Sequence, residues 1–129
     1  MITALAPQDI HPPFAPYSHG IVVPPGQRLV FCSGQLGIAA DKTIPPDCAG
    51  QTALCFDNVA VILREAGLGL EHIIRINAYV TGREHLSQYM GVRNALFSAP
   101  YPASTLMIVS GFARPEFVVE IEVIAAGPA

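Results

Sequence analysis

The sequence predicts an α+β fold in which one β-sheet carries two helices packed on one face. Three observations support this: five segments have strand composition, two have helical periodicity, and their order is strand, strand, helix, strand, helix, strand, strand. Each helix must bury its apolar stripe against the sheet, which gives two packed layers. The other face of the sheet would be open in a monomer, so we expect water or a partner subunit against it.

The first two strands are predicted at residues 20–23 and 29–33, around a turn at residues 24–27 that contains two prolines and a glycine. The second of these segments, Leu29–Ser33, is rich in β-favouring apolar residues. Residues 36–48 contain Asp and Pro residues that favour a loop.

The first helix is predicted at residues 50–66, where apolar residues recur at helical spacing. Gly67 follows directly, as a left-handed C-terminal cap requires. The stripe consists of Val59, Ile62, Leu63 and Ala66.

The next strand is predicted at residues 72–80, because apolar and polar side chains alternate there. A capping box at Thr81–Glu84 would then start a second helix that runs to about Phe97. The strand alternation places Ile74, Ile76, Ala78 and Val80 on one face and Arg75, Asn77 and Tyr79 on the other. The helix would turn Leu86, Tyr89, Leu96 and Phe97 inward.

Two further strands are predicted at residues 104–110 and 117–125, joined by a turn region at residues 111–116. No repeat or linker interrupts the 129 residues, so we expect a single domain over residues 1–129. Charged residues make up only 13%, against roughly 25% in an average soluble domain, and this excludes intrinsic disorder. A small and weakly charged chain also predicts an oligomer that covers apolar surface.

The charge balance argues against nucleic-acid and anionic-membrane surfaces. The net charge is −3, seven residues are Lys or Arg, and Lys42 is the single lysine. No apolar run approaches the ~18 residues of a membrane span, and the N-terminal segment lacks the pattern of a signal peptide. We therefore expect a cytoplasmic protein.

The cysteines and histidines predict neither a disulfide framework nor a metal site. The three cysteines, Cys32, Cys48 and Cys55, are an odd number and lack C-x-x-C spacing, and the four histidines are scattered. Cys32 would be a nucleophile only beside a base, and a small buried side chain is the better interpretation. Nucleotide-binding glycine loops are absent, so nucleotide binding by such loops is not indicated.

Two carboxylates form the most informative local feature. Glu120 and Glu122 lie two residues apart in the last predicted strand, so they share one face with Val118 and Ile124. A carboxylate on a partly apolar face is costly unless it is paired or functional. A solvated strand face with ordinary surface glutamates is the alternative.

Two other features allow both a functional and a structural interpretation. The loop containing Tyr17, Ser18 and His19 offers a phenol, a hydroxyl and an imidazole that can orient a ligand, or it is ordinary turn chemistry. Arg93 lies among apolar residues on the second helix. It is either a surface residue with a packed stem or a cation that binds a carboxylate bidentately at a subunit interface.

Taken in order, several short motifs resemble the reactive-intermediate deaminase family (RidA/YjgF, also labelled endoribonuclease L-PSP). They span nearly the whole chain, and their order and spacing are more specific than any one of them. The matching pieces are Ala15–His19, Ser33–Gln35, Gln51 with Asn58, Ala66–Leu68, Tyr79–Thr81, Pro102–Ala103 and Val119–Ala125.

The resemblance implies a chorismate-mutase-like fold assembled as a homotrimer, with the sheets forming a central barrel and clefts between subunits. It implies hydrolysis of enamines or imines such as 2-aminoacrylate to keto acids and ammonia, without metal or cofactor. The water-positioning Glu of the family corresponds to Glu120 and its Tyr to Tyr17. Its backbone-lined cleft segment corresponds to Ser33 and Gly34.

The sequence departs from the family at the Pro-Ala-Arg-Ser motif, where Ser104 replaces the signature Arg that holds the substrate carboxylate. This likens the chain to an Arg-lacking branch of the family. A lost charge-assisted contact weakens binding by about ten- to a hundredfold, so we expect deamination of 2-aminoacrylate to be weak or absent. A family-like rate would point to Arg93 or Arg114 as the substitute cation.

The sequence therefore favours a small-molecule hydrolase with an altered substrate. Glu120 and Tyr17 would position the attacking water. A small, neutral or weakly anionic ligand would be bound by Ser33, Gly34, Ser104, Thr105 and Arg93. A non-catalytic ligand-binding trimer is the alternative. RNA cleavage, which a family label suggests, is disfavoured by the net charge of −3.

Overall fold

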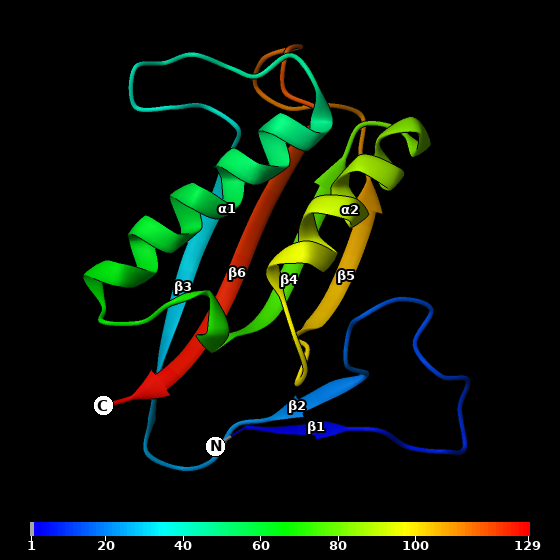
Figure 1. Ribbon diagram of the computed structural model, residues 1–129, viewed down its shortest axis with the longest axis vertical. Coiled ribbons are helices and arrows are strands. Elements are labelled where there is room, and N and C mark those ends of the chain that lie inside the picture. Colours follow the sequence, from blue (N-terminus) through cyan, green and yellow to red (C-terminus); the bar gives the residue numbers. More distant parts are fainter. Residues whose placement is uncertain (1) are drawn as a thin grey trace.

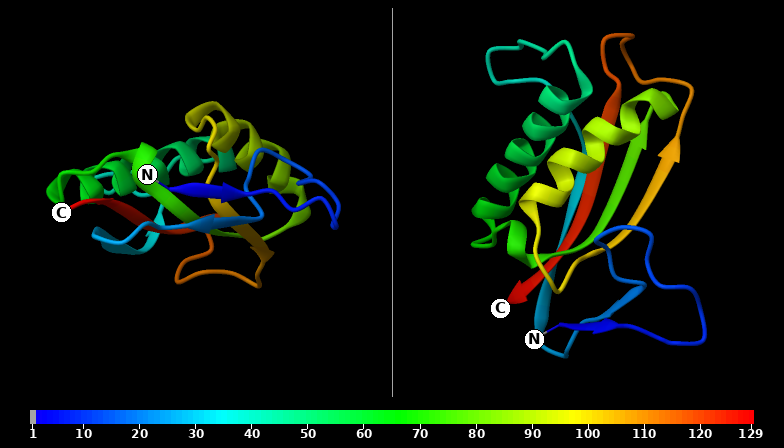
Figure 2. Two further views of the ribbon diagram at one scale, coloured as in Figure 1. Left: turned by 90° about the horizontal axis from the view of Figure 1, so that it is seen from below. Right: turned by 45° about the vertical axis from the view of Figure 1, so that its right-hand side comes forward.

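The computed structural model describes residues 2–129, and its centre is a four-stranded sheet in the order β3–β6–β4–β5. β6 is antiparallel to both of its neighbours, whereas β4 and β5 are parallel. Helices α1 and α2 lie side by side on one face of this sheet (Figures 1 and 2), which confirms the predicted α+β fold. The bounds are β3 Gln27–Leu36, α1 Cys48–Glu65, β4 Ile73–Val80, α2 Leu86–Leu96, β5 Ala103–Ile108 and β6 Val119–Pro128.

A second, two-stranded sheet forms from β1 (Thr3–Leu5) and β2 (Gly20–Val22). The expected turn between residues 20–23 and 29–33 does not pair these segments: β2 pairs with β1, which the sequence did not indicate, and β3 pairs with β6. Pro24 and Pro25, which follow β2, supply no N–H donors for a ladder, so the chain leaves one sheet there and enters the other.

Helix α1 confirms the predicted apolar stripe and its C-terminal cap. The side chain of Asp47 accepts a hydrogen bond from the Gly50 N–H at 2.9 Å, and this caps the helix N-terminus. Gly67 adopts φ +74°, the left-handed conformation expected just after the helix. Val59 and Leu63 are fully buried against the sheet.

Strand β4 departs from the predicted alternation at its start. The ladder to β6 shifts register between Ile73 and Arg75, so Ile73 is buried and Ile74 is only partly so. The alternation of Ile76, Ala78 and Val80 is confirmed, since all three are buried. A bulge adds one residue to the strand, and this moves the preceding side chain to the other face.

The start and end of α2 correct two predictions. Thr81 does not form a capping box. It directly follows the end of β4 at Val80, its N–H donates to the Val118 carbonyl, and the N-cap position is occupied by Gly82, which has no side chain to accept a hydrogen bond. A short 3₁₀ turn, η2 (Arg83–His85), then leads into α2 without a side-chain cap. Leu96 does not point inward as expected; it is 43% exposed at the end of the helix. A second 3₁₀ turn, η1 (Leu70–His72), precedes β4.

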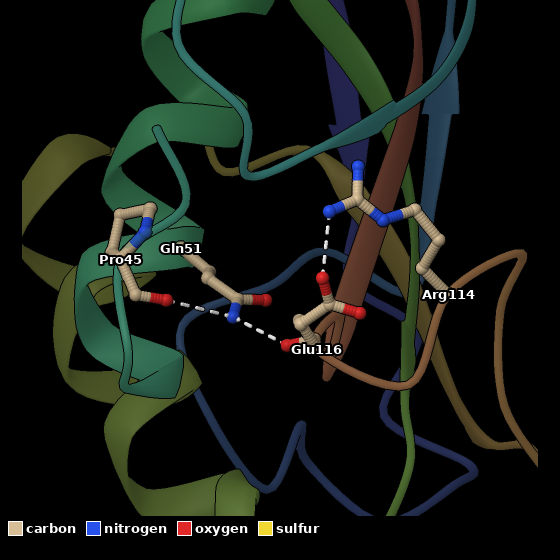
Figure 3. A network of polar contacts seen from close by, with 4 residues as sticks. All are labelled: Pro45, Gln51, Arg114 and Glu116. Atoms are coloured by element: carbon tan, nitrogen blue, oxygen red, sulfur yellow. Dashed lines mark hydrogen bonds and ion pairs between the residues drawn. The ribbon is translucent and has the colours of Figure 1, made fainter. Parts of the chain in front are cut away.

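Buried Gln51 ties two loops to the start of α1 (Figure 3). Its amide nitrogen donates to the carbonyls of Pro45 and Glu116, each at 2.9 Å, and its amide oxygen accepts from the Val118 N–H at 3.0 Å. The bonds to Glu116 and Val118 join segments that are 65 and 67 residues apart in sequence, whereas the bond to Pro45 is local. Gln51 therefore fixes the loop before α1 against the segment that leads into β6.

The sheet face opposite the helices carries polar groups in its middle and exposed apolar side chains around them. Leu29, Phe31 and Met107 on this face are 51%, 70% and 54% exposed. Large apolar side chains gathered on one face are the expected property of a surface that a partner covers. Among residues 2–129, no helix is both long and apolar enough to cross a membrane.

Candidate functional site

Three of the predicted site residues meet at the outer edge of the sheet, on the helix side of β5. The Ser18 N–H donates to the Pro102 carbonyl at 3.1 Å, and Ser18 forms a parallel bridge to Ala103. These contacts hold the N-terminal arm, residues 2–19, against the start of β5. They bring Tyr17 to the same hollow as Arg93 and Ser104.

Arg93 is buried rather than on the surface, since only 4% of the residue is exposed. One of its terminal nitrogens (Nη1) donates to the Ser104 hydroxyl at 3.3 Å. Its Nε and Nη2 donate to the Asn94 side-chain oxygen at 3.3 and 3.0 Å. Arg93 of α2 therefore lies beside Ser104 of β5, the position at which the family has its signature arginine.

Tyr89 lies beneath this arginine. The Arg93 Cζ is 5.8 Å from the centroid of the Tyr89 ring, and Tyr89 is fully buried. Its hydroxyl has no hydrogen-bond partner among the described residues. Burial raises the pKa of Tyr89 to about 12, although the neighbouring Arg93 and Ser104 act in the opposite direction.

The hollow at this edge has a volume of about 260 Å³ and combines hydroxyl and guanidinium donors with apolar walls. No carboxylate lines it. Its walls are Phe14, Ala15, Tyr17, Met90, Arg93, Ser104 and Leu106. A larger hollow of about 390 Å³, in the N-terminal arm, also contains Tyr17 but neither an arginine nor a carboxylate.

The remaining predicted residues lie on the opposite, open face of the sheet. Glu120 and Glu122 alternate with the fully buried Val119 and Ile121 along β6, so the prediction that both carboxylates share one face is confirmed. Glu120 lies against Gly34, where β3 shifts register between Cys32 and Gln35. Among residues 2–129, no side chain or backbone group donates a hydrogen bond to the Glu120 carboxylate.

Glu122, in contrast, is held by its neighbours on β4. One carboxylate oxygen accepts from the Tyr79 hydroxyl at 2.8 Å and from the Asn77 amide at 3.2 Å. The bond to Glu122 raises the pKa of Tyr79 above its ordinary value. Arg75 extends this network by donating to Asn77 at 2.9 Å and to Thr105 at 2.7 Å.

Within a single chain, the predicted site residues therefore form two separate groups. Tyr17, Arg93 and Ser104 share the edge hollow, whereas Thr105, Glu120, Ser33 and Gly34 belong to the open face. Ser33 lines a hollow of about 320 Å³ with Asn77 and Glu122. Tyr89, Asn77 and Tyr79 were not among the predicted site residues. The only sequence signals for them were the spacing of Tyr89 and Arg93 by one helical turn and the polar side of the alternation in β4.

The cysteines have the character of buried structural residues. Cys32 and Cys48 are buried, and their burial raises the pKa of each thiol. Burial also raises the pKa of Cys55 to about 12, and its thiol donates to the Gln35 carbonyl. This confirms the interpretation of Cys32 as a buried side chain. Residues 2–129 contain no cluster of three potential metal ligands.

Comparison with known proteins places this geometry in a family. The family model described as "Endoribonuclease L-PSP" matches residues 8–127. The RutC family protein YjgH of Escherichia coli is 37% identical over 128 residues, which cover 98% of this chain and 95% of that protein.

Solved structures agree with the fold. A protein of the conserved Rid family, YyfB from Yersinia pestis, has a TM-score of 0.85 at 24% identity, with 98% of each chain covered, and shows the same architecture. E. coli TdcF, whose structure was solved with bound serine, has a TM-score of 0.73 at 28% identity and covers 97% of this chain and 98% of its own. The chain therefore belongs to the RidA/YjgF (endoribonuclease L-PSP) family, whose members include enamine and imine deaminases.

Proposed function

We propose that this chain is a small-molecule hydrolase that acts on enamine or imine compounds in a cleft between subunits of a homotrimer. The observation that supports it most is the contrast between the two glutamates of β6. The Glu122 carboxylate accepts hydrogen bonds from Tyr79 and Asn77. The Glu120 carboxylate has no hydrogen-bond donor among residues 2–129 and lies on a half-buried face. A positioned carboxylate with free lone pairs is what holding and deprotonating a water requires.

The division of the site over two faces supports a cleft made by more than one copy. Tyr17 and Arg93 lie at the outer edge of β5, and Glu120 lies on the open face, so a neighbouring chain is needed to bring the two groups together. The exposed apolar side chains on that face, among them Phe31 at 70% exposure, give a second copy something to cover.

The substrate is recognised differently than in family members with the signature arginine, because Ser104 stands at that position. Its hydroxyl, with Thr105 and the backbone at Ser33 and Gly34, would bind the ligand by hydrogen bonds. No metal or cofactor takes part in the proposed reaction. The expected site in the cell is the cytoplasm, and the proposed partners are a small ligand and two further copies of the chain, not nucleic acid.

The test is ammonia release from a panel of enamines and imines, with enzymatically generated 2-aminoacrylate as the first member. Glu120→Gln keeps the shape of the side chain and removes the charge, and it is expected to lower turnover by roughly 10²–10⁴-fold. Glu122→Gln is the matched control, since a glutamine oxygen still accepts from Tyr79, and it should keep most of the activity.

If no panel member is hydrolysed, while a small ligand binds wild type and Glu120→Gln equally, the enzyme proposal is wrong. The non-catalytic ligand-binding trimer then takes its place. Equal losses in the two glutamine variants would show that Glu120 has no special role.

A further inference from the structure

Arg93 is a buried cation whose charge has no partner of opposite sign. Guanidinium groups stay protonated in proteins. Within residues 2–129, no carboxylate lies within ion-pair distance of Arg93. Its hydrogen bonds go to the neutral oxygens of Asn94 and Ser104, and the Tyr89 ring lies 5.8 Å from its Cζ. Burying a charge is costly unless an ion or strong hydrogen bonds compensate it. A group held in this way is suited to receive an anion.

The donors around Arg93 are only partly used. Of its five N–H groups, three donate to Asn94 and Ser104, which leaves one on each terminal nitrogen. Fully buried Tyr89 adds a hydroxyl without a partner among the described residues. The two free N–H groups of this buried cation form an incomplete site, and an acceptor with two oxygens completes it.

We propose that Arg93 is the anion-binding and specificity-determining residue of this cleft, and that it binds the carboxylate of a small ligand with an apolar substituent. The carboxylate accepts from the two free N–H groups of Arg93 and from the hydroxyl of Ser104. The substituent lies against Phe14, Met90 and Leu106, in a hollow of about 260 Å³. This inference builds on the proposed function, because the ligand occupies the same cleft.

The cation of α2 is in direct contact with the serine of the strand, because the Ser104 hydroxyl accepts from Nη1 of Arg93 at 3.3 Å. The carboxylate is then bound from α2 rather than from β5. The expectation of a neutral or weakly anionic ligand, which rested on Ser104 alone, is replaced by that of a carboxylate.

Arg114, the other candidate cation, and Arg75 of β4 are both unsuitable. Arg114 lies on an exposed loop and pairs with Glu116 at 2.6 Å. Arg75 is on the open face, where Asn77 and Thr105 accept its hydrogen bonds. Neither lines the hollow that Tyr17 and Ser104 share.

The test is ligand binding followed by NMR, with 4-methyl-2-oxopentanoate as the carboxylate probe and its amide as the neutral counterpart. Wild type should bind the carboxylate at least tenfold more tightly than the amide. Arg93→Gln should weaken carboxylate binding by roughly ten- to a hundredfold and leave amide binding unchanged. Arg114→Gln removes the same charge from the exposed loop and should bind like wild type.

Equal binding of acid and amide by wild type overturns the proposal, and this measurement requires no variant to fold. No binding of the acid by wild type, or loss with Arg114→Gln instead of Arg93→Gln, overturns it as well. Because the probe is not hydrolysed, binding through Arg93 can be found even where ammonia release fails, so failure of the reaction and failure of the anion site are distinguishable.

Discussion

Gly34 lies so close to Glu120 that a Cβ atom at position 34 would be 2.8 Å from the carboxyl carbon of that glutamate. Real Cβ atoms do not approach other atoms this closely, so any side chain at residue 34 displaces the carboxylate. The position of the Glu120 side chain therefore depends on the glycine in the bulge of β3. This makes Gly34 a positioning residue for the proposed base.

Gly34→Ala is expected to lower turnover by at least about tenfold, because a displacement of the order of 1 Å costs up to 10²-fold in rate. The loss should appear in kcat and should not add to that of Glu120→Gln in the double variant. Gly111→Ala is the matched control, since a Cβ there meets nothing within 4 Å. Additive losses would show that Gly34 acts independently of Glu120.

Gln51→Ala is expected to destabilise the protein by about 3 kcal/mol or more. The variant leaves the Val118 N–H and the carbonyls of Pro45 and Glu116 without their partner, and buried unpaired groups cost about 1–3 kcal/mol each. Gln88→Ala removes a single bond, from the Ala49 N–H to an exposed side chain, and should cost about 1 kcal/mol or less. Chemical denaturation measures both, and equal losses would contradict the assignment.

Tyr89→Phe is expected to make the protein less sensitive to alkali. The pKa of Tyr89 rises from 10.0 to about 12 on folding, so the stability held by the neutral phenol is intact below pH 10 and is lost as the pH rises through 12. Phenylalanine has no proton to lose, so the free energy of unfolding of the variant should fall by about 2 kcal/mol less than that of wild type over this pH range. Denaturation between pH 9 and 12 measures the slope.

Light scattering is expected to return three times the chain mass of 13.7 kDa at micromolar concentration. Phe31→Glu places a charge on the 70%-exposed apolar side chain of the open face and should dissociate the assembly. Val61→Glu, on a 51%-exposed position of α1, should leave it intact. A wild-type monomer would refute the trimer and, with it, the shared cleft.

The fold could be predicted because its helices and central strands carry strong periodic patterns. The stripe of α1 and the alternation of β4 both follow from burial on one side of an element. The alternation failed at Ile74, because a bulge changes the face of a side chain without changing the composition. The pairing of β2 with β1 was also missed, since a short strand carries little information about its partner.

The site was predicted less completely, because it depends on distances across the fold. Helical spacing linked Arg93 to Tyr89, but only the packing of α2 on β5 brings Arg93 to Ser104. The two glutamates of β6 look equivalent in sequence. The hydrogen bonds from Tyr79 and Asn77 separate them, and these arise from register between strands that are distant in the chain.

Strand β6 is the last strand in the chain but lies between β3 and β4 in the sheet. No two of the earlier long strands except β4 and β5 can pair before residues 119–128 are available. Until then α1 has no completed sheet to pack against, and β3 has no neighbouring strand to pair with. During synthesis this chain therefore passes through a long interval with exposed apolar surface, and its final ten-residue strand closes the whole core in one late step.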